Sequence, residues 1–313
     1  MRVFVAGGTG AVGRVLLPLL VENGHKVVAL VRTMEKARDV ERRGARAAFA
    51  DPLDRVALTE AIGRAKPEVV INQLTALARM GDFRKFDEEF ALTNRFRTEV
   101  TDTMLAAAAQ AGARRVIVQS FCGWPFARQG GPVKTEEDPL DPHPPASFRR
   151  TLGAIRYLED AVRRATEVEA LALRYGFFYG PGTGIAADSP IVDLVRKRRF
   201  PMVGAGGGIW SFIHIRDVAR ATVAAISRGS PGIYNVVDDD PAPVATWLPV
   251  LARAVGAKPP FRVPEWLGRL LIGEGGVSMM TKIRGGSNEK AKRELAWRPE
   301  FASWRRGFSD GMR

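Results

Sequence analysis

Four glycines stand within seven residues near the start of the chain, in the sequence Gly7-Gly8-Thr9-Gly10-Ala11-Val12-Gly13. An apolar run precedes this loop and a helical pattern follows it. Such glycines let the backbone turn tightly, and the free N–H groups at the start of the helix can hold a pyrophosphate. We therefore predict that a dinucleotide binds here, through Gly7, Thr9, Gly10, Ala11, Val12 and Gly13. A glycine-rich turn without a ligand is the alternative.

A basic residue stands where the second strand is expected to end. Dinucleotide-binding folds that prefer NAD usually carry an acidic residue about 20 positions after the loop, where it binds the ribose 2′-hydroxyl. Here that position holds Arg32, with Thr33 and Lys36 close behind. A guanidinium suits a 2′-phosphate through paired hydrogen bonds. The sequence thus predicts NADP(H) in preference to NAD(H), with Arg32 and Lys36 as ligands, unless Arg32 simply lies in solvent.

The elements that must position these residues form an alternating series. Short β-branched runs alternate with helical patterns, which is typical of βαβ units and a parallel sheet. Runs such as 69–71 and 116–118 are apolar on both faces, as strands covered by helices on each side are. Strands are expected at 2–6, 26–31, 47–50, 69–73, 115–119 and 170–175, and helices near 13–22, 35–43, 55–65, 86–111 and 151–165. The predicted fold class is α/β, a Rossmann-type doubly wound parallel sheet.

Beyond residue 175 the pattern predicts a smaller, discontinuous C-terminal subdomain. Gly/Pro-rich stretches interrupt the chain, and a strand at 210–215, a helix at 217–227 and a strand at 232–236 then resume. We expect a dinucleotide-binding core over residues 1–175, with 210–236 returning to it, and a substrate-binding subdomain from residues 176–209 and 237–313. The apolar helix at 263–272, followed by the glycine-rich stretch 273–276, is either a lid or a surface for a second subunit in a homodimer.

Composition restricts the class of protein further. With 313 residues, 46% hydrophobic and 26% charged, the chain is typical of globular proteins and unlike disordered or fibrous ones. One cysteine, Cys122, and three histidines offer neither a disulfide nor metal-ligand spacing, so no metal is expected. The net charge of +13 suits a phosphorylated small molecule, and no nucleic-acid-binding motif accompanies it. We expect a cytoplasmic protein with a small-molecule substrate, and neither nucleic acid nor membrane as a partner.

Several later segments, together with the glycine loop, resemble the short-chain dehydrogenase/reductase superfamily, in its atypical or extended branch related to NAD-dependent epimerases and dehydratases. They are Asp51-Pro52-Leu53, Gln73-Leu74-Thr75, and residues 173–182, 212–221 and 232–235. The resemblance runs along essentially the whole chain. It implies that Asp51, Pro52 and Leu53 hold the adenine, that Gln73, Leu74 and Thr75 line the nicotinamide ribose, and that Tyr175 and Phe178 lie beside the nicotinamide.

The chain departs from this pattern at the residues that handle the proton. Members of the superfamily that act on carbonyls normally carry Tyr-x-x-x-Lys, whose tyrosine gives or takes a proton while the lysine lowers its pKa. The tyrosines here are Tyr157, Tyr175, Tyr179 and Tyr234, and none is followed four residues later by lysine. Anchoring on Glu159 places Thr151 and Ile155 at the missing positions. Candidates for stabilising developing charge are then Ser120, Thr151 and Tyr175.

These features predict an NADP(H)-dependent oxidoreductase that transfers hydride to or from a small organic carbonyl, hydroxyl or conjugated substrate without the usual Tyr/Lys pair. Tryptophans 210, 247 and 266 favour an enclosed apolar pocket, and so an enzyme. Loss of the pair favours the alternative of a non-catalytic NADP(H)-binding redox sensor. A sugar-nucleotide epimerase or dehydratase is a weaker alternative, because it requires the missing base.

Overall fold

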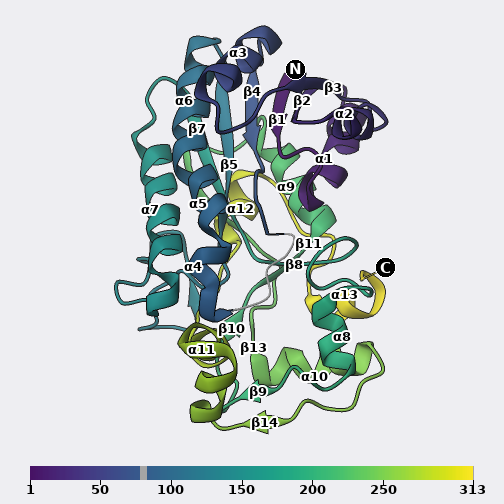
Figure 1. Cartoon of the computed structure of the whole chain (residues 1–313), viewed down its shortest axis with the longest axis vertical. Helices are drawn as coiled ribbons and strands as arrows, with labels where there is room; N and C mark the ends of the chain where they lie inside the picture. The colour runs from purple at the N-terminus through teal and green to yellow at the C-terminus, as the bar shows by residue number, and fades with distance from the viewer. Residues whose placement is uncertain (78–82, 313) are drawn as a thin grey trace.

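A seven-stranded parallel sheet forms the centre of the computed structural model, which describes residues 1–77 and 83–312 (Figure 1). The strands lie in the order β12-β7-β5-β4-β1-β2-β3. Their bounds are β1 Arg2–Ala6, β2 Lys26–Val31, β3 Arg46–Phe49, β4 Val69–Asn72, β5 Arg115–Phe121, β7 Glu169–Tyr175 and β12 Gly232–Val236. The order reverses between β1 and β4, and ligands of open α/β sheets bind outside the carboxyl ends of the strands at such a reversal, a place that we call the crevice. The predicted α/β fold class is confirmed.

Helices cover both faces of this sheet, which explains why its strands are apolar throughout. One face packs against α1 (Ala11–Glu22), α2 (Met34–Glu41), α9 (Ile215–Ala225) and α12 (Glu289–Glu294). The other face packs against α3 (Arg55–Ala65), α6 (Thr101–Gln110) and α7 (Arg149–Arg164). Every residue of β4 is buried. Buried strands of this kind carry no alternation between polar and apolar residues.

The helix expected at 86–111 is broken into several pieces. It comprises α4 (Phe86–Glu89), α5 (Ala91–Arg95), the π-helix η2 (Phe96–Val100) and α6. A π turn holds an additional residue, and π turns occur frequently at functional sites. The buried side chains of Thr93, Phe96, Arg97 and Val100 follow the i, i+3, i+4, i+7 spacing of one helix face.

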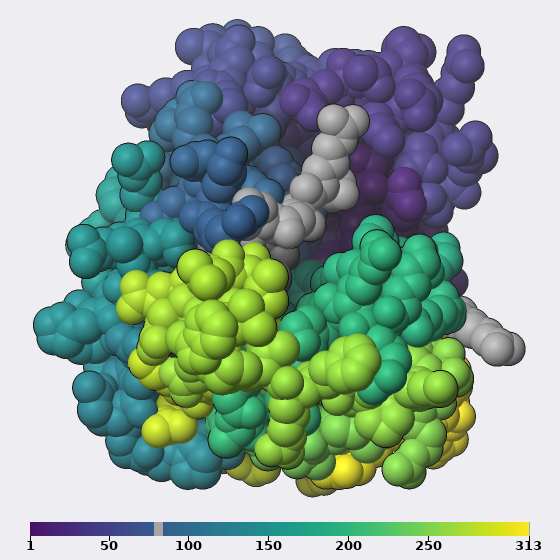
Figure 2. Space-filling view, turned by 60° about the horizontal axis from the view of Figure 1, so that its bottom comes forward, coloured from purple at the N-terminus to yellow at the C-terminus, as the bar shows by residue number. Residues whose placement is uncertain are grey.

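The C-terminal part of the chain builds a smaller subdomain, which lies below the main sheet in Figure 1 and is coloured green to yellow in Figure 2. The core of this subdomain is rich in aromatic side chains. Its helices are α8 (Pro190–Arg196), α10 (Val244–Ala254), α11 (Glu265–Thr281) and α13 (Trp304–Asp310). Its short strands pair as β8 (Phe177–Tyr179) with β11 (Phe212–His214), β10 (Ile209–Trp210) with β13 (Ala242–Pro243), and β9 (Met202–Val203) with β14 (Arg262–Val263). The strand expected at 210–215 is therefore two strands, and neither joins the main sheet. Of the segment 210–236, α9 and β12 pack with the core, and the proposed division into two units stays a prediction.

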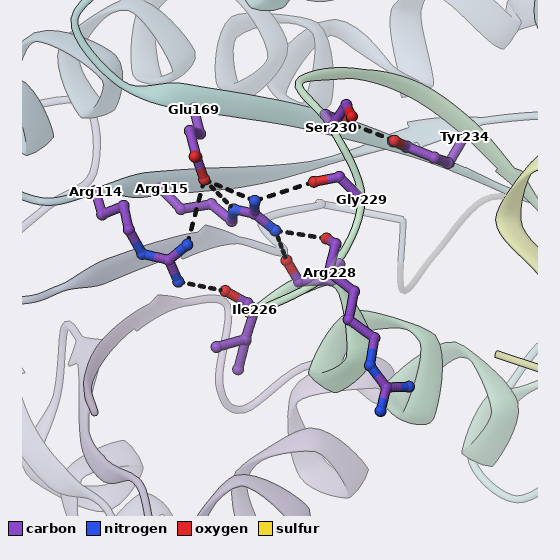
Figure 3. A network of polar contacts seen from close by, with 9 residues as sticks. Arg114, Arg115, Glu169, Ile226, Arg228, Gly229, Ser230 and Tyr234 are labelled. Carbon is purple, nitrogen blue, oxygen red and sulfur yellow. Dashed lines mark hydrogen bonds and ion pairs between the residues drawn. The ribbon is translucent and has the colours of Figure 1, made fainter. Parts of the chain in front are cut away.

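A buried arginine joins the amino edge of the sheet to the end of α9 (Figure 3). Arg115 is 4% exposed, and its guanidinium donates to Glu169 and to the carbonyl oxygens of Ala225 and Gly229, at 2.7 and 3.0 Å. Carbonyl groups at a helix end have no partner within the helix, and a cation there also meets the negative end of the helix dipole. Arg115 thus fixes α9 against β5, on the opposite side of the molecule from the crevice.

Helix α11 contains the segment predicted to be a lid. Gly273 interrupts it with φ +71°, so residues before and after this glycine form two helical segments at a bend. Trp266, Leu270 and Leu271 of the first segment are exposed. Movement of this segment, and its contact with a second subunit, stay predictions. No helix among the described residues is long and apolar enough to cross a membrane.

Candidate cofactor and substrate site

The glycine loop connects β1 to α1 and has the geometry that a pyrophosphate requires. The amide of Gly10 donates to the carbonyl of Gly7 at 3.0 Å, and Gly10 is the N-cap of the 12-residue helix α1. The first turn of α1 carries no acidic residue, so the positive end of the helix dipole is unopposed there. Thr9 is half-buried and Gly10 is exposed. The loop can therefore present backbone N–H groups to an anion.

Two of the glycines are required by close approach. A Cβ at Gly7 would lie 2.6 Å from the backbone carbonyl of Gln73, and Gly7 has φ +90°. A Cβ at Gly13 would lie 2.3 Å from the carbonyl oxygen of Gly7. Gly13 and Val12 are buried, so their contribution is to pack the loop rather than to touch a ligand through a side chain. These contacts hold the loop beside the end of β4.

Arg32 lies at the carboxyl end of β2 and is exposed. Thr33 accepts the backbone N–H of Lys36 at 3.3 Å and so caps α2, while Lys36 is half-buried. Among the described residues no carboxylate forms an ion pair with Arg32. Its guanidinium is therefore free to bind an additional phosphate at this strand end.

The predicted adenine turn follows β3. Oδ1 of Asp51 accepts the backbone N–H of Leu53 at 2.9 Å, which leaves Oδ2 free to accept a hydrogen bond. Pro52 is buried and Leu53 is half-buried. The turn therefore combines a free acceptor with an apolar side chain, the pair of features that an aminopurine requires.

The residues after β4 form a polar layer beside the loop. The side-chain amide of Gln73 is turned toward the core, while the carbonyl of Leu74 accepts from Gln119 at 2.7 Å and Thr75 is exposed. Phe178 is half-buried against Tyr175, with ring centroids 5.8 Å apart. Backbone and side-chain atoms of Leu74, Thr75 and Phe178 thus remain accessible at the crevice, and their contact with a cofactor stays a prediction.

Tyr175 occupies a different environment from the one expected. It is 0% exposed, and its hydroxyl bonds to Gln73 at 2.8 Å and to Thr222 of α9 at 2.9 Å. Burial raises its pKa to about 12. In this structure the hydroxyl is therefore paired within the protein, and the contact of Tyr175 with the cofactor and its role in catalysis stay predictions.

The other two expected catalytic hydroxyls are also enclosed. Ser120 is 4% exposed and donates to Glu159 at 3.0 Å, and Glu159 in turn forms a buried ion pair with Arg174. Thr151 is 0% exposed and donates to Asp87 at 2.6 Å. Each hydroxyl has a protein partner, so neither is presented to a substrate in this structure. Burial also raises the pKa of the Cys122 thiol, which argues against a nucleophilic role.

The residues around Thr151 include three that sequence reasoning did not identify. Asp87 accepts the hydroxyl of Thr151, and Asn94 donates its amide N–H to the same oxygen at 3.1 Å. The guanidinium of Arg97 donates to the amide oxygen of Asn94 at 3.3 Å. All three lie between residues 86 and 100, where a helical pattern gives no indication of function. Among the described residues, no three His, Cys, Asp or Glu side chains gather in a metal-binding arrangement.

A doubly wound sheet with a glycine loop at its point of reversal and a C-terminal subdomain defines a nucleotide-binding protein of the extended short-chain dehydrogenase/reductase type. The chain belongs to the NAD dependent epimerase/dehydratase family, whose model matches residues 3–236. This confirms the resemblance drawn from the sequence motifs.

Two relatives with assigned activities are reductases. The chain is 42% identical over 309 residues to a 3-diazoavenalumate denitrifying reductase of Streptomyces sp, covering 98% of this chain and 99% of the relative. It is 31% identical over 263 residues to a 4-hydroxy-2-methyl-3-oxo-4-farnesyl-3,4-dihydroquinoline-1-oxide ketoreductase of Stigmatella aurantiaca, covering 82% of this chain and 74% of the relative. These similarities indicate an oxidoreductase.

Two solved structures share the fold at lower identity. A UDP-glucose 4-epimerase of Thermotoga maritima superposes with a TM-score of 0.76 at 21% identity, over 100% of this chain and 97% of the other. A human epimerase family protein solved with NADPH superposes with a TM-score of 0.76 at 18% identity, over 100% and 99%. At this identity the superpositions establish the architecture.

Proposed function

We propose that the chain is an NADP(H)-dependent reductase that delivers hydride to a small, electrophilic organic substrate. The observation that carries this proposal is the glycine loop, whose N-cap and unopposed helix end fit a pyrophosphate, in a chain 42% identical to a reductase over almost its full length. When bound, the nicotinamide supplies the hydride, and the protein supplies binding, alignment and exclusion of water.

The preference for NADP(H) is proposed from Arg32. One or two charge-assisted hydrogen bonds to a 2′-phosphate contribute about 1.5–3 kcal/mol, which corresponds to roughly a 10- to 100-fold change in affinity. Arg32→Ala should raise the Kd of NADPH by that factor and leave the Kd of NADH unchanged. Arg38→Ala, which changes an exposed arginine in the last turn of the following helix α2, is the matched control. Equal affinities for both coenzymes in the unaltered protein, also unchanged in Arg32→Ala, would refute this preference.

The substrate class is proposed from the proton balance of the site. Reduction of a ketone needs a proton for the alkoxide, whereas the hydroxyls of Ser120, Thr151 and Tyr175 are enclosed and already paired. An arenediazonium group needs none, since hydride addition with loss of nitrogen balances without it: ArN₂⁺ + H⁻ → ArH + N₂. The similarity to a denitrifying reductase for a diazo compound supports this class. Acceptors protonated by water, such as quinones, also satisfy the balance.

A turnover experiment tests both steps of this proposal. Purified protein is incubated with NADPH deuterated at C4 and with 4-hydroxybenzenediazonium, together with parallel ketones, enones, imines and quinones. We expect NADPH consumption, one deuterium on the carbon that bore nitrogen, and transfer from one face of the nicotinamide only. A protein-free reaction is the control, because it transfers without facial selectivity. If none of these compounds causes NADPH to be consumed, the proposed reductase activity is refuted.

A redox sensor is the second candidate, and the enclosure of all three hydroxyls favours it. A sensor would bind NADPH with the predicted dependence on Arg32 yet turn over none of the compounds. The experiments above therefore separate the two functions without further assumptions.

A further inference from the structure

One arginine in the interior carries a positive charge that the surrounding protein does not balance. Arg97 is 7% exposed, and Nη1 of its guanidinium donates to the amide oxygen of Asn94 at 3.3 Å. A guanidinium has five N–H donors. No carboxylate of the described residues lies within ion-pair distance of it. Burial lowers the pKa of this guanidinium to about 10, so the unliganded fold disfavours its charge.

Two acidic groups are connected to Arg97, Glu159 electrostatically and Asp87 through Thr151 and Asn94, and both are committed to other partners. Glu159 attracts Arg97 electrostatically, but both of its oxygens already bind Arg174, at 2.7 and 2.6 Å. Asp87 accepts Thr151 and the backbone N–H groups of residues 150 and 151 at the start of α7. An unpaired buried charge costs several kcal/mol. Such a cost points to a function, because a hydrophobic residue would stabilise the fold better.

The location of Arg97 is next to the vacated proton-handling position. It bonds to Asn94, and Asn94 bonds to Thr151, the residue that stands where the superfamily's tyrosine is expected. Side chains on a helix point toward its amino end, and the guanidinium accordingly lies 5.5 Å from the ring of Phe90, seven residues earlier. Arg97 lies on the buried face of the segment, four residues after the buried Thr93 and three before the buried Val100. Glu159, which attracts Arg97, also accepts the hydroxyl of Ser120. The next residue, Phe121, ends β5 and is half-buried in edge-to-face contact with the half-buried Phe177, the first residue of β8.

We propose that Arg97 binds a carboxylate or phenolate oxygen of the substrate and thereby anchors an aromatic anion beside the hydride donor. The inference rests on the proposed function and specifies the substrate class of the same site. A guanidinium pairs with a carboxylate through two parallel hydrogen bonds, and the half-buried aromatic side chains suit an aromatic body. Arg97 transfers no proton, which agrees with a step that needs none.

The test compares a carboxylate with its neutral ester. The full-length protein is saturated with NADP⁺ and titrated calorimetrically with 4-hydroxycinnamate, benzoate and methyl 4-hydroxycinnamate. We expect each carboxylate to bind at least 10-fold more tightly than the ester, since a charge-assisted pair contributes about 1.5 kcal/mol or more. Arg97→Met should abolish this preference, and Arg97→Lys should retain part of it. Arg95→Met, an exposed neighbour paired with Glu99 at 2.7 Å, is the control and should retain all of it.

Thermal unfolding separates this role from a structural one, because replacing an arginine that only stabilises the fold would lower the Tm. If Arg97 serves a ligand, Arg97→Met removes an unpaired buried charge and raises the Tm of the unliganded protein by about 2 °C or more. Equal binding of carboxylate and ester by the unaltered protein, or a preference that survives in Arg97→Met, would overturn the inference. Absence of NADP⁺ binding in the same calorimeter would instead refute the proposed function, so the two failures are distinguishable.

Discussion

The buried ion pair between Glu159 and Arg174 gives the sharpest prediction about stability. Both side chains are 1% exposed, and the guanidinium donates to both carboxylate oxygens, at 2.7 and 2.6 Å. Glu159→Gln puts an amide N–H against the guanidinium and leaves that cation without a counter-charge. Breaking a buried pair from one side costs about 3–5 kcal/mol. We expect a loss of this size in the free energy of unfolding.

Urea denaturation followed by circular dichroism measures the effect. The double variant Glu159→Leu/Arg174→Met should recover at least about half of the loss, because it removes both charges and leaves none uncompensated. Glu99→Gln, which breaks an exposed pair with Arg95, is the matched control and should leave the midpoint unchanged. A loss below about 1 kcal/mol in Glu159→Gln would refute the reasoning, since the buried pair would then behave like an exposed one. A double variant less stable than Glu159→Gln would also refute it.

Three further predictions concern the site and its scaffold. Gly13→Ala should abolish NADPH binding, because its Cβ would lie 2.3 Å from the backbone of Gly7; a calorimetric titration with unchanged affinity would contradict this. Tyr175→Phe should cost about 1–2 kcal/mol and leave NADPH affinity unchanged. The folded tyrosine keeps its proton to about pH 12 and the unfolded one loses it near pH 10, so stability falls as pH rises through this window and the variant should lack that part of the fall. Arg115→Met should cost about 3 kcal/mol by urea denaturation, because it orphans carbonyls at the end of α9, and near-neutral stability would exclude that role.

The sheet and the nucleotide loop were predictable because their signals are local. Runs such as 69–71 are apolar on both faces only where helices cover both sides, and β4 is buried at every residue. The glycines of the loop stand directly between a strand and a helix, and steric contact explains Gly7 and Gly13. Arg32 follows β2 immediately, so the end of the strand alone fixes its place.

The continuous burial of β7 made the strand predictable from the sequence, and the same burial made the orientation of Tyr175 unpredictable. Six of the seven residues of β7 are buried, so no polar alternation shows which face of the sheet a side chain joins. The hydroxyl is bonded by Thr222, which lies 47 residues later on α9. Sequence position shows that Tyr175 ends a strand, whereas only the packing of α9 shows that its hydroxyl lies beneath the crevice.

Arg97 illustrates a second limit of sequence reasoning. Arg97 lies four residues after the buried Thr93 and three before the buried Val100, so helical spacing places it on the buried face of the segment. The sequence does not show which partners Arg97 has, because these depend on the packing of the segment against α7. Even so, one signal was available, because an arginine flanked by buried residues at 96 and 100 interrupts the apolar pattern of the segment.

The proton balance connects the lost Tyr/Lys pair to the kind of reaction that remains accessible. Thr151, predicted to hold the position of the tyrosine, donates its hydroxyl to Asp87, which also accepts the backbone N–H groups of residues 150 and 151 at the start of α7. In this arrangement the hydroxyl of Thr151 is committed to Asp87 and is not presented as a proton donor. A hydride acceptor that is already cationic, or whose product anion is stable in water, avoids the need for such a donor. Reduction of an unactivated ketone still needs a proton donor, and we expect such ketones to be the poorest substrates in the panel.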